Sequence, residues 1–200
     1  MAAKTFDVYE FQIILKETTP KIWRRIQVPE YYNFWDFHIA IQHAMGWKST
    51  IWNYHLHQFE MINPKTSKKV SIGIPDEEWA FGEVYDEEKL KISQYFSLSN
   101  KKADYEYDFG DGWQHEILLE KILPAVVNAK YPQCIAGERE CPPEDCGGVY
   151  GYEELLEILA NPKHEEYKER KSWLKRIGVN EVKPENFDPK SVKFSNFQLE

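Results

Sequence analysis

Residues Lys102 to Lys121 read KADYEYDFGDGWQHEILLEK, and this stretch decides the fold. Apolar and polar side chains alternate on both sides of Gly110-Asp111-Gly112, which predicts two antiparallel strands joined by a three-residue loop. In that register His115 lies opposite Tyr107, and one face is apolar, formed by Tyr105, Tyr107, Phe109, Trp113, His115, Ile117 and Leu119. The other face is polar and should meet solvent, with Asp104, Glu106, Asp108, Gln114 and Glu116.

Further elements are expected on both sides of this hairpin. Before it we expect strands at 8–15 and 22–28, a helix from Asn33 to Met45 that Gly46 ends, a strand at 52–62, a loop with short strands at 71–86 and a short helix at 87–94. After it we expect an irregular loop over 123–148, then helices at 150–160 and about 164–177. The sequence therefore predicts an α+β fold with a mostly antiparallel sheet and helices packed on one side. We expect one domain over residues 1–200, with the C-terminal helices and tail from about residue 150 docked on it.

The composition narrows the class of protein. With 33 acidic and 25 basic residues the chain has a net charge of -8, which argues against a nucleic-acid-binding surface. The sequence shows neither a signal peptide nor a stretch that could span a membrane, so we expect a soluble, cytoplasmic protein without membrane contacts. Its three cysteines lie close together and are odd in number, which fits a reducing compartment.

The segment Cys141-Pro142-Pro143-Glu144-Asp145-Cys146 brackets two carboxylates with two thiols on a loop stiffened by proline. One interpretation is a divalent metal site, because thiolates bind borderline metal ions well. The other, which the spacing favours, is an ordered loop with buried thiols and with carboxylates that cap the next helix.

Histidines offer further candidate ligands. His55 and His57 are two positions apart in an expected strand, so both imidazoles would lie on one face and could reach one ion. The alternative is that one histidine packs in the core and the other lies at its rim, and His115 on the apolar hairpin face allows the same two interpretations. The candidate metal ligands are His55, His57, His115, Cys141 and Cys146.

Other polar residues form a candidate functional cluster without an assigned catalytic role. Asp108 and Asp111 flank the glycine turn, where they can satisfy turn amides or form an acid site. Arg24 can bind an anion or pair with one of the many carboxylates. The cluster comprises Arg24, Asp108, Asp111, Trp113, Glu144 and Asp145.

Five motifs together resemble the plasmid pRiA4b ORF-3-like family. They are Trp23-Arg24-Arg25, Met45-Gly46-Trp47, His55-Leu56-His57-x-Phe59, Tyr107-x-Phe109-Gly110-Asp111-x-Trp113-x-His115 and Cys141-Pro142-Pro143-Glu144-Asp145-Cys146-Gly147-Gly148. The resemblance covers about residues 6–177 and implies a protein of unknown function that is associated with plasmids or mobile elements.

Two functions follow as hypotheses. The first is a binding or interaction module with a protein or small-molecule partner, because no complete catalytic set is present. The alternative is a metal-dependent, hydrolase-like enzyme in which His55, His57, His115, Cys141, Cys146 and Asp111 converge on one ion. Nucleic-acid binding through Arg24 and Arg25 is a third hypothesis, which the acidic balance disfavours.

Overall fold

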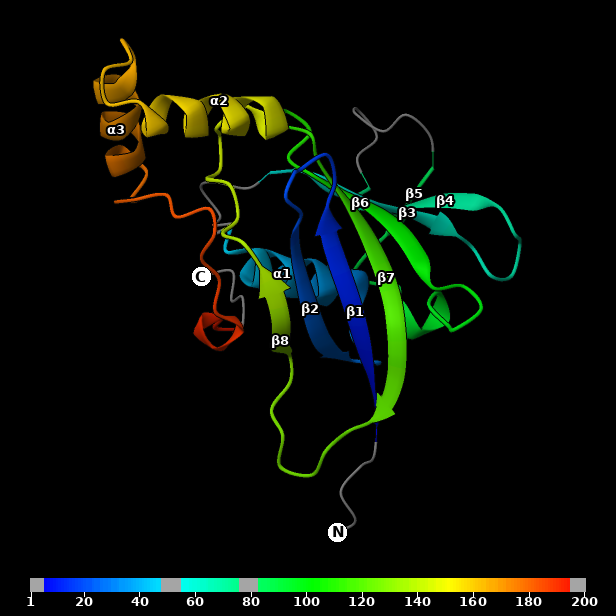
Figure 1. Ribbon diagram of the computed structural model, residues 1–200. Coiled ribbons are helices and arrows are strands. Elements are labelled where there is room, and N and C mark those ends of the chain that lie inside the picture. The colour runs from blue at the N-terminus through cyan, green and yellow to red at the C-terminus, as the bar shows by residue number, and fades with distance from the viewer. Residues whose placement is uncertain (1–5, 48–54, 76–82, 195–200) are drawn as a thin grey trace.

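A computed structural model describes residues 6–47, 55–75 and 83–194, and it has one eight-stranded sheet (Figure 1). The strands are β1 (Asp7–Leu15), β2 (Ile22–Pro29), β3 (His57–Ile62), β4 (Lys69–Gly73), β5 (Val84–Asp86), β6 (Lys102–Tyr107), β7 (Trp113–Pro124) and β8 (Gln133–Glu138). Their order is β5-β4-β3-β6-β7-β1-β2-β8, and only β4 and β5 pair in parallel. The predicted α+β class with a mostly antiparallel sheet is confirmed.

The helix α1 (Phe34–Met45) packs on one face of this sheet, behind β1 and β2 in Figure 1. It begins where predicted, because Asn33 and Asp36 form a capping box, and it ends at Gly46, which has a φ of 103°. The ring centroids of Phe37 and of Phe11 on β1 are 4.6 Å apart, and both rings are fully buried. Burial of such side chains, about 2 kcal/mol each, holds the helix to the sheet.

The hairpin of β6 and β7 is confirmed, but its register differs from the predicted one by two residues. Tyr107 pairs with Trp113 and Tyr105 pairs with His115, so the loop spans residues 108–112 and Phe109 is half-exposed. Asp108 adopts a φ of 55°, and its backbone oxygen accepts a hydrogen bond from the Gly112 nitrogen. A shift of two residues keeps every side chain on its face, so alternation alone could not distinguish the two registers.

Three other elements differ from the sequence expectation. The loop expected over 123–148 contains the edge strand β8, which pairs with β2 and has no alternating apolar pattern that would reveal it. The helix expected at 87–94 is only a 3₁₀ turn, η1 (Ile92–Gln94), and the strand expected from Trp52 begins at His57. Residues 52–54 lie outside the described residues.

The C-terminal helices lie beyond one end of the sheet, and the first of them starts next to the β6–β7 loop (Figure 1). They are α2 (Gly148–Ala160) and α3 (Tyr167–Arg176), and a second 3₁₀ turn, η2 (Pro189–Ser191), contacts β8. Gly148 starts α2 so close to the hairpin that a Cβ atom there would lie 2.3 Å from the Asp111 carbonyl oxygen. Across the described ranges, the helices are too short or too polar for a membrane span.

Candidate functional site

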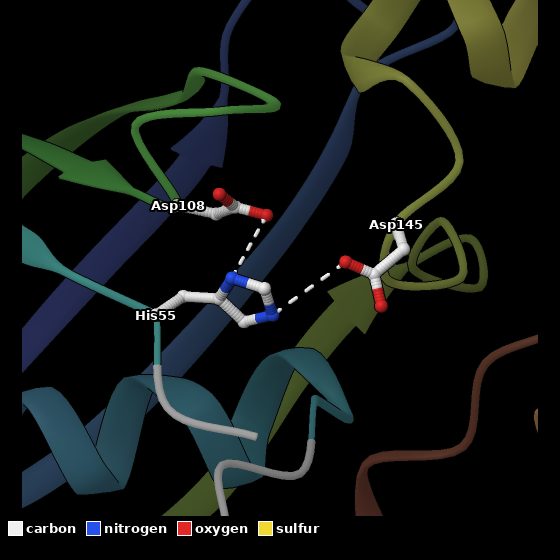
Figure 2. A group of neighbouring side chains, drawn as sticks. All are labelled: His55, Asp108 and Asp145. Carbon is white, nitrogen blue, oxygen red and sulfur yellow. Dashed lines mark ion pairs between the residues drawn. The ribbon is translucent and has the colours of Figure 1, made fainter. Parts of the chain in front are cut away.

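His55, Asp108 and Asp145 come together at the end of the sheet where α2 begins (Figure 2). Each offers one potential metal-ligand atom, and these atoms lie within 4.8 Å of one another. The Nδ1 atom of His55 is 3.2 Å from Oδ2 of Asp108, and its Nε2 atom is 3.7 Å from Oδ1 of Asp145. Within the described parts of the chain, this is the one group of three such residues.

Separate segments supply the three side chains. His55 lies just before β3, Asp108 directly after β6, and Asp145 in the loop that leads to α2. The Asp108 nitrogen donates a hydrogen bond to the Leu56 carbonyl oxygen at 2.9 Å, which fixes the first two segments to each other.

Both carboxylates of the group are on residues with left-handed backbone conformations. The φ angles are 55° for Asp108 and 57° for Asp145, a region that aspartate tolerates better than most residues and that is enriched at functional sites. Oδ1 of Asp108 accepts a hydrogen bond from the Gly110 nitrogen at 3.0 Å, while Oδ2 faces His55. The Asp108 carboxylate therefore contacts both a backbone nitrogen of the turn and the His55 ring.

The loop that carries Asp145 is held against the hairpin by polar contacts. The Tyr107 hydroxyl donates to Oε1 of Glu144 at 2.6 Å, and the Gly147 nitrogen donates to Oδ2 of Asp111 at 3.2 Å. These two acidic residues were predicted in the functional cluster, and the structure places both beside the group as residues that position it.

The two nitrogen atoms of His55 have different surroundings. Asp108 favours a proton on Nδ1, which leaves the lone pair on Nε2. That Nε2 atom is buried and has no hydrogen-bond partner among the described residues, and it faces the half-exposed Asp145 carboxylate. The group can therefore offer one imidazole lone pair and one carboxylate oxygen to a cation.

The six ligands expected to converge on one ion do not do so in the described structure. His57 lies in the core, where its Nε2 atom is 2.6 Å from the buried Glu87 carboxylate and its ring stacks on His38 at 3.4 Å. His115 is fully buried with Nδ1 3.0 Å from the Trp113 carbonyl oxygen, and desolvation lowers its pKa to about 4. The core interpretation fits these two histidines, because His57 packs against His38 of α1 and His115 packs against Trp47.

The cysteines also lie apart from His55. Burial raises the pKa of the Cys146 thiol to about 12 and that of Cys141 further still, so both are neutral thiols at pH 7. Cys134, Cys141 and Cys146 are free. The ordered-loop interpretation fits the described geometry of this segment.

Arg24 and Trp113 do not join the predicted functional cluster. Arg24 is 1% exposed and donates to the backbone oxygens of Ala44, Trp23 and Glu138 at distances of 2.8–3.0 Å. Its guanidinium carbon also lies 3.6 Å from the centroid of the Phe187 ring. Trp113 is fully buried under Trp47. Both side chains have structural contacts, and those of Arg24 with Ala44 and Glu138 could not be predicted because these residues lie far from it along the chain.

A buried polar network beneath the group was not predicted. The Tyr105 hydroxyl accepts a hydrogen bond from Nε2 of Gln42 at 3.0 Å and lies 2.7 Å from Nδ1 of His38. A signal for this network was present in the sequence. His38 and Gln42 follow Phe34 at intervals of four residues, which places them on the inner side of the predicted helix together with Ile41.

Comparison with known proteins identifies relatives of unknown function. The model of the plasmid pRiA4b ORF-3-like protein family matches residues 7–195. The uncharacterized protein y4hQ from Sinorhizobium fredii (strain NBRC 101917 / NGR234) is 37% identical over 166 residues, which are 83% of this chain and 80% of that protein. A crystal structure of a protein of unknown function, MM3350 from Methanosarcina mazei Go1, is 49% identical with a TM-score of 0.83 and covers 94% of this chain and 99% of its own. The names of these relatives state no activity and no ligand.

Proposed function

The chain belongs to the plasmid pRiA4b ORF-3-like family, and from this premise we propose that it is a binding module for a divalent metal ion. The ion would be held by Nε2 of His55 and a carboxylate oxygen of Asp145. Asp108 would act behind His55, where a carboxylate orients a metal-binding imidazole and raises its basicity.

The observation that carries this proposal is the 3.7 Å between Nε2 of His55 and Oδ1 of Asp145. This distance is too long for a hydrogen bond. Two ligands about 2.1 Å from one zinc ion, at a tetrahedral angle, lie about 3.4 Å apart. A small closing movement of the half-exposed Asp145 would therefore complete the pair of ligands.

An imidazole with carboxylates suits zinc, and also manganese and iron in their divalent forms. With two protein ligands, the remaining coordination positions would be open to water or to a bound molecule. A zinc ion held by His55 and Asp145 would lower the pKa of a bound water and could so supply a hydroxide nucleophile. A metal-dependent hydrolase is the second candidate function, and it is favoured by a cavity that Asp145 also lines.

We further propose that residues 1–200 form one domain in a reducing compartment such as the cytoplasm. Tyr152 from α2 belongs to the main hydrophobic core, and Val182 and Phe194 pack against it, which supports docking of the C-terminal part. The three free thiols support the proposal of a reducing compartment. The proposed association with plasmids rests on the name of the family.

The test is metal content and zinc titration of tag-free protein purified without chelator, measured by inductively coupled plasma mass spectrometry and isothermal calorimetry. We expect one ion per chain, loss of binding in His55→Ala and Asp145→Asn, and an affinity roughly 10- to 100-fold lower in Asp108→Asn. His164→Ala is the matched control, because the His164 ring lies outside the group, where its Nδ1 atom accepts a hydrogen bond from the Glu166 nitrogen. Folded protein without saturable binding, or equal binding by His55→Ala and the control, would refute the metal site.

A further inference from the structure

A cavity of about 460 Å³ lies beside the proposed metal site. The end of α1, the loop that begins at Cys141 and the segment 177–182 after α3 surround it. Its size falls in the range that holds small organic ligands. Asp145 lines this cavity and its carboxylate also faces His55, so the cavity and the group share this residue.

The wall of the cavity has both apolar and polar parts, and the apolar part is well supported. Met45, Trp47, Pro143, Ile177 and Val182 are among its lining residues. The Trp47 indole nitrogen donates to the Pro142 carbonyl oxygen at 3.0 Å, and the Trp47 ring stacks on Tyr107 with centroids 4.9 Å apart. A wall fixed in this way loses little conformational freedom when a ligand binds.

Among the described residues that line the cavity, the charged ones have one sign. Glu140, Glu144 and Asp145 line it, and none of the described lining residues is a lysine, arginine or histidine. Cys141 adds no charge, because burial raises the pKa of its thiol. Such a surrounding disfavours phosphates and carboxylates as ligands and favours a cation.

We propose that this cavity binds an organic primary amine in its ammonium form. The ammonium group donates hydrogen bonds toward the Asp145 carboxylate, and the apolar body of the ligand lies against Trp47 and Val182. Charge-assisted hydrogen bonds of this kind are stronger than neutral ones, and each buried methylene group adds a factor of about four to the affinity. The inference goes beyond the proposed metal site and needs no ion.

The experiment uses the full chain in the presence of a chelator, so that its outcome does not depend on metal binding. The probes are hexylammonium, 1-hexanol and hexanoate, which share a six-carbon body and differ in charge. Binding is followed by ¹H–¹⁵N nuclear magnetic resonance through the indole N–H signal of Trp47. We expect saturable binding of hexylammonium, about fivefold weaker binding of hexanol and none of hexanoate.

Two variants and a control complete the test. Asp145→Asn should weaken hexylammonium binding about fivefold without changing hexanol binding, whereas Val182→Trp should fill the cavity and abolish both. Glu153→Gln removes an exposed carboxylate elsewhere on α2 and should bind like the unaltered chain. The proposal is overturned if no probe saturates, if hexanol or hexanoate binds as tightly as hexylammonium, or if Asp145→Asn behaves like Glu153→Gln.

Discussion

Replacement of Arg24 by methionine should destabilise the protein strongly and leave the metal site intact. Arg24 donates to the carbonyl oxygens of Ala44, Trp23 and Glu138, and so joins the end of α1 to β2 and β8. Methionine fills a similar volume but donates no hydrogen bond, so the Ala44 oxygen would lose its donor in a buried region and the other two oxygens would lose theirs in partly buried surroundings.

The size of the effect follows from these contacts. A buried acceptor left without a donor costs about 1–3 kcal/mol and a typical hydrogen bond contributes about 0.5–1.5 kcal/mol, so one buried and two partly buried contacts sum to about 2–6 kcal/mol. Burial lowers the pKa of Arg24, which reflects a desolvation cost that the substitution removes. We therefore expect a net loss near the lower end, about 3 kcal/mol in the free energy of unfolding.

The assay is urea unfolding followed by tryptophan fluorescence, with Arg25→Met as the matched control. Arg25 pairs with Glu120 on the open face of the sheet at 2.5 Å, and both side chains are more than a fifth exposed. Its loss should cost at most about 1 kcal/mol. If Arg24→Met does not fold, Arg24→Lys is measured instead. Lysine can reach fewer oxygens, and the free energy of unfolding of this variant should fall by about half as much.

Equal stability of the Arg24 and Arg25 variants would refute the structural role of Arg24. A folded Arg24→Met protein that no longer binds zinc would show that Arg24 contributes to the proposed metal site.

Three further perturbations test other parts of the structure. Gly148→Ala should weaken zinc binding and cost more than 2 kcal/mol in urea unfolding, because its Cβ would meet the Asp111 carbonyl oxygen at 2.3 Å, whereas Gly112→Ala, with a similar φ and open space, should cost about 1 kcal/mol. Between pH 6.5 and pH 4 the unaltered protein should lose about 3 kcal/mol more stability than His115→Gln, because His115 takes up a proton in the unfolded chain near pH 6.5 but only near pH 4 in the folded chain. A flat profile, or an equal slope in His115→Gln, would contradict that origin. Cys146→Ser should keep the zinc stoichiometry of the unaltered protein by mass spectrometry, and a loss of zinc would show that the thiol is a ligand.

Local signals predicted the fold where they acted over a few residues. The capping box at Asn33 and the left-handed Gly46 gave the bounds of α1, and alternation gave the faces of the β6–β7 hairpin. The edge strand β8 was not predicted. It is paired on one side only, and its exposed and half-buried side chains do not alternate. Its position depends on pairing with β2, which lies about a hundred residues earlier in the chain.

The residues of the candidate site were each singled out from the sequence, whereas their spatial arrangement was not predicted. His55, Asp108 and Asp145 each belonged to a candidate set, but His55 was grouped with His57 because residues two apart in a strand share a face. In the structure His55 precedes β3, so its ring leaves the sheet, while the His57 ring enters the core beside Glu87. That separation depends on where the strand begins, and composition places strand ends poorly.

Removal of metal should leave the protein folded, because protein contacts alone hold the segments of the site in place. Trp47 binds the Pro142 carbonyl oxygen and Tyr107 binds Glu144, so the loop that carries Asp145 is anchored on the apolar core without help from an ion. The ion would then act as a ligand of a preformed site, unlike a zinc finger, which is unfolded without its metal. Zinc at a hundredfold excess over its dissociation constant should raise the free energy of unfolding by about 2.7 kcal/mol through mass action, and chelation should only reverse that gain. Circular dichroism before and after chelation measures this directly, and a chelated chain without its native spectrum would mean that the ion, rather than these contacts, orders the loop.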